Sequence, residues 1–229
     1  RLARHLALGR QGQRAAAAYV GAGDQALAAG LRREEARALD AALGCLARVD
    51  DRHLRFQVLE RRCRPARFVD GYAEQLRLAD ELQVLAEGPV ERADAELARA
   101  GVLAEGQQWR EAMPLVECAL QRLAADDSPR QRRGAALLAQ CRMGLGDAEG
   151  AIRAMQAGIG DAMDAGDSEA ARYLIELAIL VGKADRPREA WQLLQRARAV
   201  ADAQHDWGLA SQVYVYLGWV HTNLARTRR

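Results

Sequence analysis

Histidine and cysteine are the side chains of this sequence best suited to nucleophilic, acid–base or metal chemistry, but their spacing argues against all three. The four cysteines form no CxxC pair, which is the usual spacing of zinc and redox sites. The sequence also lacks an HExxH, GxSxG, GxGxxG or phosphate-loop motif. We therefore predict no catalytic residue, no metal and no cofactor. The scattered residues are His5, His53, His205, His221, Cys45, Cys63, Cys118 and Cys141.

The charge balance argues against a dedicated nucleic-acid binder, because the net charge of the 229 residues is only +2. Residues 1–67 are locally basic, with 14 Arg against 7 acids. Such a basic end attracts phosphates or an acidic partner, or it is simply a solvated arginine-rich surface. No run approaches 18 apolar residues, so we expect no membrane span. Free thiols and the absence of a signal peptide favour the cytoplasm.

A short segment that recurs along the sequence, which we call the cassette, predicts the helices that position any binding residue. The segments REEA, YAEQ, WREA, AEGA and PREA end at Ala36, Gln75, Ala112, Ala151 and Ala190, so the steps between them are 39, 37, 39 and 39 residues. Apolar residues recur at helical intervals before and after each cassette, with a short break between. Each repeat is therefore predicted to be a helix–turn–helix unit.

The breaks between the two helices of a unit contain residues that end and start helices. We expect the breaks at Gly106 and at Gly146-Asp147, with Asp147 and Asp185 as N-caps and Pro187 in a first helical turn. Asp50-Asp51, and the segments 126–129 and 165–168 between units, are further predicted caps.

Small residues recur where the two helices of each unit must cross. The cassette end is Ala in four of five units, and Ala or Cys occurs 12 positions earlier in four. Because small side chains let helix backbones approach, this pattern predicts antiparallel pairs that stack into a solenoid. Gln75 and Asp24 depart from it.

These residues resemble the tetratricopeptide repeat (TPR), a helix pair with small residues at the crossing. The resemblance implies an all-α fold, a right-handed α-solenoid of antiparallel helix pairs with a period of about 39 residues. We expect one superhelical domain over residues 1–229, with about five pairs and partial units at both ends. The repeat phase then indicates a piece of a longer protein.

The concave face of such a solenoid is the expected binding surface. Helical register places residues 18, 15, 11, 8 and 7 positions before each cassette end on that face, including Glu60, Asp94 and Ile175. The predicted face carries charges of both signs, with more cations than anions. The guanidinium of Arg can donate two hydrogen bonds to one carboxylate or phosphate. An acidic peptide or an anionic small molecule would fit it, although the same charges also serve solubility. The candidate ligand-binding residues are Arg64, Arg133, Gln140, Arg172 and Lys183.

The C-terminal helix carries an apolar stripe of Val213, Tyr216, Leu217 and Val220, with aromatic residues on its other faces. Two interpretations stay open. A following helix covers this surface as core, or the surface is exposed and forms a dimer interface. The aromatic residues on the other faces are Trp207, Tyr214 and Trp219.

The first 30 residues resemble the start of the helical-repeat arm of STAND-type bacterial regulatory ATPases similar to the maltose-system activator. An LAxHxxxxG run is similar to this sequence at Leu2, Ala3, His5 and Gly9, where three residues rather than four separate His5 from Gly9. An AAxYxxxAGDxAL run is similar to this sequence with two residues rather than three between Tyr and Ala. The matching residues are Ala17, Tyr19, Ala22, Gly23, Asp24 and Ala26. The resemblance implies a sensor arm of a signal-transduction or transcriptional regulator, with the DNA-binding part outside this segment.

Together these observations favour a non-catalytic arm that binds a protein, peptide or effector within a multidomain regulator. The alternatives are a free-standing TPR scaffold and a receptor for a peptide or phosphorylated small molecule. An enzyme is the least favoured of the four hypotheses.

Overall fold

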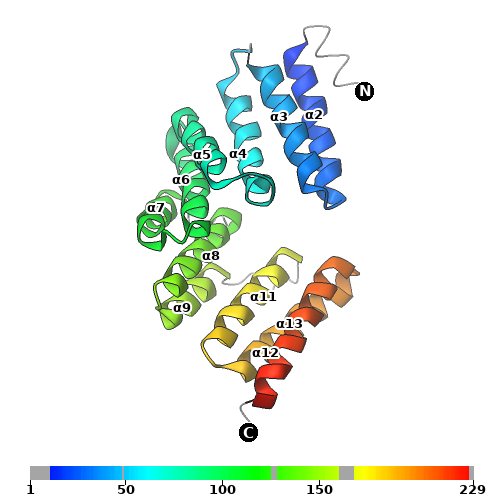
Figure 1. The fold of residues 1–229 in the computed structure, drawn as a ribbon, viewed down its shortest axis with the longest axis vertical. Helices are drawn as coiled ribbons and strands as arrows, with labels where there is room; N and C mark the ends of the chain where they lie inside the picture. The colour runs from blue at the N-terminus through cyan, green and yellow to red at the C-terminus, as the bar shows by residue number, and fades with distance from the viewer. Residues whose placement is uncertain (1–10, 48, 125–127, 160–167, 227–229) are drawn as a thin grey trace. The chain divides into compact units, whose positions relative to one another are not determined.

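The computed structural model describes residues 11–47, 49–124, 128–159 and 168–226, and in these ranges it is entirely helical (Figure 1). The predicted all-α class is therefore confirmed for this part of the chain. Eleven helices are described: α2 (Gly12–Ala28), α3 (Arg32–Leu46), α4 (Arg52–Val69), α5 (Tyr72–Leu85), α6 (Gly88–Glu105), α7 (Trp109–Arg122), α8 (Ser128–Gly144), α9 (Ala148–Ile159), α11 (Ser168–Lys183), α12 (Pro187–Gln204) and α13 (Trp207–Arg226).

The helices follow the predicted repeat. The five cassettes begin α3, α5, α7, α9 and α12, and the preceding helices α2, α4, α6, α8 and α11 are the first helices of the units. Helix α13 then begins a sixth unit. All five cassette ends are buried, and Ala112, Ala151 and Ala190 have no exposed surface. The small residues therefore lie at helix crossings, as their spacing predicts.

The chain divides into two compact units, residues 1–108 and 109–229. In the first, α4 lies between two apolar clusters. Its Val58 packs with Leu39 and Leu46 of α3, whereas its Phe56 and Leu59 pack with α5 and α6. Because α4 is apolar on two sides, it joins the first helix pair to the helices that follow it.

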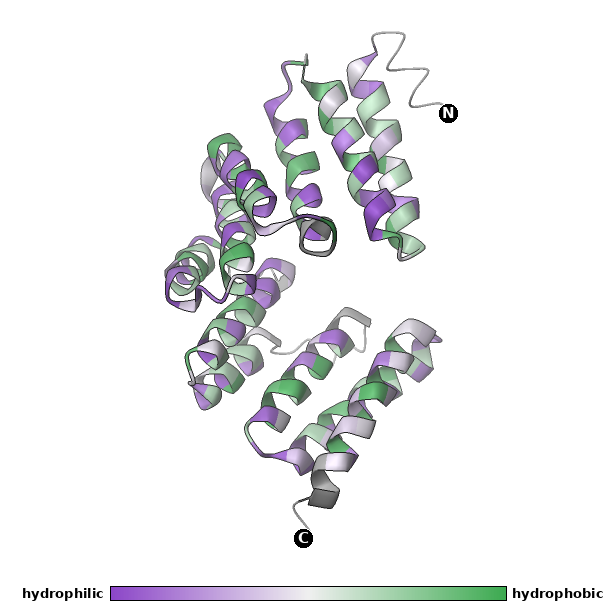
Figure 2. Ribbon diagram, viewed as in Figure 1, coloured by the Kyte–Doolittle hydropathy of each residue, from purple (hydrophilic) through white to green (hydrophobic). Residues whose placement is uncertain are grey.

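In the second unit, one continuous apolar core runs through α8, α9, α11, α12 and α13. Its small residues include Ala139 and Ala178, which lie 12 positions before a cassette end and were assigned to crossings from the sequence. Charged residues occur on the other faces of α8, α9, α11 and α12, so these helices show both hydrophobic and hydrophilic residues (Figure 2). This two-sided composition is what stacked amphipathic helices require.

The caps agree with the sequence in two cases. Asp147 Oδ1 accepts the backbone N–H of Gly150 at 2.8 Å at the start of α9, and Asp51 Oδ1 accepts that of Leu54 at 2.9 Å at the start of α4. Pro187 is the first residue of α12, where its missing N–H leaves no helical bond unmade.

One cap assignment is wrong. Asp185 does not cap α12; it has φ 60°, and Arg186 occupies the N-cap position. The break expected at Gly106 is confirmed: α6 ends at Glu105 with Gly106 at its C-cap, and the left-handed residue of that turn is Gln107, with φ 60°. Each of these two turns has one left-handed residue, and polar residues such as Asp tolerate that conformation better than branched ones. The predicted caps at 126–127 and 165–167 lie outside the described residues.

Candidate functional site

Four of the five candidate ligand-binding residues lie on two first helices of the second unit. Arg133 and Gln140 are seven residues apart on α8, and Arg172 and Lys183 are eleven apart on α11. Both spacings are close to whole numbers of helical turns, so each pair occupies one face of its helix. Gln140, Arg172 and Lys183 are exposed, and Arg133 is half-buried.

The polar partners of these residues differ. Arg133 already takes part in a polar or electrostatic contact. Arg172 and Lys183 make no ion pair with another side chain among the described residues of the chain. An exposed, uncompensated cation is the kind of group that attracts an anionic ligand. Arg172 and Lys183 are therefore the two best-placed cations of the predicted face.

Arg64, the fifth candidate, lies on α4 in the first unit, where it is engaged with a carboxylate. Its guanidinium donates to Glu60 at 2.8 and 3.0 Å, a pair spaced four residues apart on one helix. The sequence placed both residues on the predicted concave face. Their pairing neutralises the charge that Arg64 would offer to a ligand.

Some positions assigned to the concave face are part of the core instead. Ile175 is 3% exposed and belongs to the apolar cluster of the second unit, and Asp94 and Glu60 are also buried. The prediction that they line an open face is therefore wrong. First helices also contact each other, α4 with α6 and α11 with α13, so the packed face is wider than the stripe derived from one helix.

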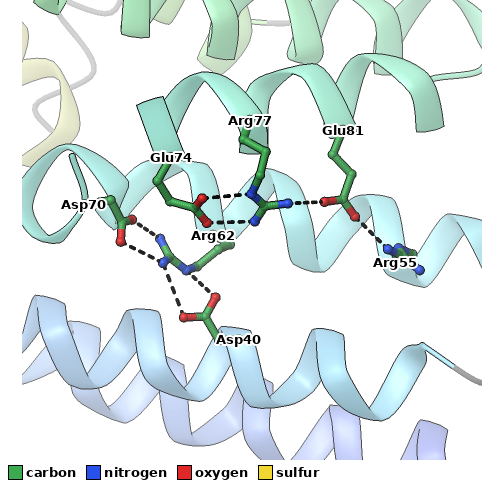
Figure 3. Close-up of polar contacts among 7 residues, drawn as sticks. All are labelled: Asp40, Arg55, Arg62, Asp70, Glu74, Arg77 and Glu81. Atoms are coloured by element: carbon green, nitrogen blue, oxygen red, sulfur yellow. Dashed lines mark hydrogen bonds and ion pairs between the residues drawn. The ribbon is translucent and has the colours of Figure 1, made fainter. Parts of the chain in front are cut away.

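A buried arginine network in the first unit was not predicted from the sequence. Arg62 of α4 is 4% exposed and lies between Asp40 of α3 and Asp70 of the α4–α5 turn (Figure 3). It donates to Asp40 at 2.7 and 3.3 Å and to Asp70 at 2.7 and 3.2 Å. Burial alone would lower the pKa of Arg62, but the hydrogen bonds with Asp70 and Asp40 outweigh it and raise the pKa.

A second chain of ion pairs runs beside Arg62. Arg77 of α5 donates to Glu74 at 2.7 and 2.8 Å and to Glu81 at 3.1 Å, and Glu81 in turn accepts from Arg55 of α4 at 2.7 Å (Figure 3). The hydrogen bond to Glu74 raises the pKa of Arg77, and the same bond lowers the pKa of Glu74. The carboxylates of Figure 3 each accept from an arginine, so the cluster orients helices rather than preparing an acid or a base.

The start of α6 is fixed by a third arginine–carboxylate pair. Glu91 accepts from Arg52 of α4 at 2.6 and 3.1 Å and from the backbone N–H of Glu87 at 2.8 Å. His53 Nδ1 lies 3.0 Å from the same carboxylate. The Arg52 hydrogen bond is the main reason that the pKa of Glu91 falls to about 2, since burial acts in the opposite direction.

Gln75, which stands at a cassette end in place of Ala, shows how a larger residue fits a helix crossing. It is buried, and its Nε2 donates to the backbone oxygen of Asp70 at 3.1 Å. The amide therefore fastens the α4–α5 turn to α5. The other departure, Asp24, is exposed and pairs with Arg61 of α4.

Aromatic rings cover glycines at the ends of first helices. A Cβ on Gly106 would lie 2.7 Å from the Tyr72 ring, and one on Gly144 would overlap the ring of Trp109. Tyr72 and Trp109 each stand three residues before a cassette end. At the next unit that position is Ala148, and the glycine there, Gly182, is covered instead by Trp219 of α13. The recurring aromatic and the glycine 34–35 residues later are a signal that the sequence contained.

No group of three or more His, Cys, Asp and Glu that could hold a metal occurs in the described part of the chain. No helix within the described ranges is both long and apolar enough to cross a bilayer. The candidate site offers a polar helical surface on which Arg172 and Lys183 are exposed and make no ion pair with a described side chain.

Solved structures similar to this one are helical-repeat proteins. A Rap protein complexed with Competence and Sporulation Factor matches with a TM-score of 0.72 and 14% identity, over 91% of this chain and 65% of that one. The apo form of RapI matches with a TM-score of 0.65 and 14% identity, over 90% and 77% of the two chains. The TPR-like repeats of a putative kinesin light chain from Podosopora anserina match with a TM-score of 0.59 and 18% identity, over 82% and 95%.

The chain has a TPR-like fold. At these sequence identities the similarity concerns the fold alone. The 39-residue spacing of the cassettes is the feature of the sequence that accounts for this fold. No protein-family model matches the sequence, and no curated protein matches it significantly. The resemblance to the repeat arm of STAND regulators is not confirmed by these comparisons; residues 1–10, which carry its first motif, lie outside the described residues.

Proposed function

We propose that this chain is a non-catalytic, TPR-like module that binds an acidic segment of a protein or peptide partner. The observation that carries the proposal is the pair Arg172 and Lys183, exposed on one face of α11 without an ion pair among the described side chains. Arg133 and Gln140 occupy the corresponding face of α8, which packs against α11. A similar fold is seen in the Rap protein complexed with Competence and Sporulation Factor, which supports the use of such a stack for binding.

The test measures binding of fluorescently labelled peptides that differ in Asp and Glu content, at two ionic strengths. Acidic peptides should bind more tightly at low salt, because exposed charge pairs are screened by ions. The double variant Arg172→Ala/Lys183→Ala should weaken binding roughly three- to tenfold.

The matched control removes two exposed arginines from second helices, Arg153→Ala in α9 and Arg188→Ala in α12. It lowers the net charge by the same amount and should leave binding unchanged. Equal losses in both double variants would show non-specific attraction and would reject the proposed face.

An anionic small-molecule effector is the second candidate, because Arg172 and Lys183 would bind a phosphate by the same chemistry. Thermal-shift measurements with phosphorylated metabolites test it. A ligand present at 100 times its dissociation constant stabilises the folded state by roughly 2.7 kcal/mol. A shift that survives in Arg172→Ala/Lys183→Ala places the ligand elsewhere.

We further propose that the module is the sensor arm of a cytoplasmic, multidomain bacterial signalling or transcriptional regulator. The support is the STAND-like run at residues 17–26. A free-standing scaffold is the alternative, and both agree with the fold. The full-length gene product distinguishes them: a regulator has an ATPase and a DNA-binding domain in the same chain, whereas a scaffold has neither. Self-association through the C-terminal helix stays a prediction that either architecture allows.

A further inference from the structure

The exposed side of α11 consists of charged side chains. From Ala171 to Lys183 the exposed residues are Arg172, Glu176 and Lys183. The other residues of this stretch are buried or half-buried, and most of them belong to the apolar core of the second unit or pack against it. The exposed side of α11 therefore offers a ligand charged groups and little apolar surface.

Helix α11 has described neighbours that precede it and that follow it in the sequence. It packs with α8 and α9 before it, and with α12 and α13 after it. Arg172, Glu176 and Lys183 are exposed although all four of these helices are in place. The charged side of α11 is therefore a surface that the packing of the second unit leaves open.

The two cations on this side are held at a fixed separation. Arg172 and Lys183 are eleven residues apart, which is about three helical turns and a rise of about 16 Å. A single anionic group would reach both only if the two side chains lay along the helix toward each other and lost rotamer freedom. A ligand that engages both cations therefore needs two anionic groups at a similar separation.

An extended segment of polypeptide matches this separation. Extended backbone advances about 3.1 to 3.3 Å per residue, so residues five positions apart are separated by about 16 Å. A helical segment would instead need apolar surface to pack on, which the exposed side of α11 does not offer. On the neighbouring α8, the exposed amide of Gln140 has both a donor and an acceptor for the backbone of an extended segment.

We propose, on the basis of the function proposed above, that this face selects an extended segment with two acidic residues five positions apart and no acidic residue opposite Glu176. Arg172 binds one of the two acidic residues and Lys183 binds the other. The face is then specific for the spacing of acidic residues in the partner rather than for their number.

Glu176 gives the face its selectivity against a continuous acidic run. It follows Arg172 by one helical turn, a rise of about 6 Å, and it is exposed while also taking part in a contact of its own. That rise corresponds to about two residues of extended chain. An acidic residue two positions from the one bound by Arg172 would therefore meet a like charge, which disfavours binding.

The spacing is tested at low salt with fluorescently labelled peptides that contain two Glu residues and a neutral, Pro-rich filler. The filler keeps the chain extended, and capping both ends removes the terminal charges. The peptide with Glu residues five positions apart should bind roughly two- to fivefold more tightly than peptides with Glu residues two or eight positions apart. A gain of this size is expected from the one additional exposed charge pair.

Single substitutions identify the groups that measure the distance. Arg172→Ala or Lys183→Ala should make all spacings bind alike, because one cation cannot distinguish them. Arg153→Ala is the matched control: it removes an exposed arginine of α9 and should keep the preference for five positions. Circular dichroism checks that the variants are folded.

A third Glu, placed two positions inside one end or the other of the best peptide, tests the part assigned to Glu176. In one of the two placements it should weaken binding, although the peptide becomes more acidic. Glu176→Gln should remove that loss, whereas Glu117→Gln, at an exposed acid of α7, should not.

The outcomes separate this inference from the proposed function. Acidic peptides that bind equally well at every spacing would overturn the inference and leave the acidic-segment function standing, as would a preference that survives in both Arg172→Ala and Lys183→Ala. Binding of no acidic peptide at all would overturn both. A third Glu that strengthens binding in both placements would reject the selectivity assigned to Glu176.

Discussion

Gly158 of α9 lies so close to Ala135 of α8 that a Cβ on the glycine would overlap the Cβ of the alanine. The contact closes the α8–α9 crossing, seven residues after the cassette end at Ala151. Two backbones can come this close only where one of the facing residues has no side chain. The relationship between these two residues explains why this unit has a glycine there.

Gly158→Ala should therefore destabilise the chain by about 1–3 kcal/mol, despite the higher helix propensity of alanine. Urea unfolding measures the effect. Gly44→Ala is the control: Gly44 is in α3 with nothing within 4 Å of its added Cβ, and this substitution should be neutral or stabilising by up to about 1 kcal/mol. Equal effects at both sites would show that the crossing is not closely packed.

Arg62→Ala should cost about 3 kcal/mol, since it leaves Asp40 and Asp70 without the guanidinium that binds both. Arg77→Ala removes an arginine from the neighbouring ion pairs, but its side chain is 57% exposed, so the loss should be below about 1 kcal/mol. Chemical denaturation of the two variants compares them directly. A loss for Arg77→Ala as large as that for Arg62→Ala would contradict the assigned difference in burial.

Glu91 should make the stability of the first unit depend on acid pH. Its pKa is about 2 in the folded state against an ordinary value of 4.5, so its contribution is complete above about pH 4.5 and is lost as the pH falls toward 2. Glu91→Gln should destabilise the chain at pH 7 by about 1–2 kcal/mol, after allowance for solvent screening. In urea titrations at pH 7 and pH 3, the difference between wild type and variant should shrink at the lower pH. A constant difference would show that the Arg52 pair is not formed.

The cassette ends at Gln75 and Ala151 should not tolerate each other's residue. Gln75→Ala restores the consensus type but removes the hydrogen bond to the Asp70 oxygen and leaves a void, so a loss of about 1 kcal/mol is expected. Ala151→Gln places a long polar side chain at a crossing with no exposed surface and should cost about 1–3 kcal/mol. Thermal unfolding compares the pair. A stabilising Gln75→Ala would show that this crossing accepts Ala, the residue at the other cassette ends.

The sequence alone determined the helical class, the pairing of helices and the burial of the crossing residues. These features depend on side-chain size and on a fixed spacing, and both are properties of the chain itself. Ala112, Ala151 and Ala190 could be assigned to crossings without coordinates, because a small residue that recurs at a constant interval is typical of stacked helix pairs. The caps at Asp51 and Asp147 were predictable for the same local reason.

Only the tertiary structure decided which charges are buried and which apolar residues are exposed. The chain has 32 arginines, and nothing local distinguishes Arg62 from Arg61 or Arg64; packing of α3 against α4 brings Asp40 to Arg62, 22 residues away. The same holds for Ile175 and Tyr214, which share a repeat position yet differ in exposure because α13 packs against α11. Periodicity gives the direction of a side chain on its helix, whereas its partner depends on how the helices pack together.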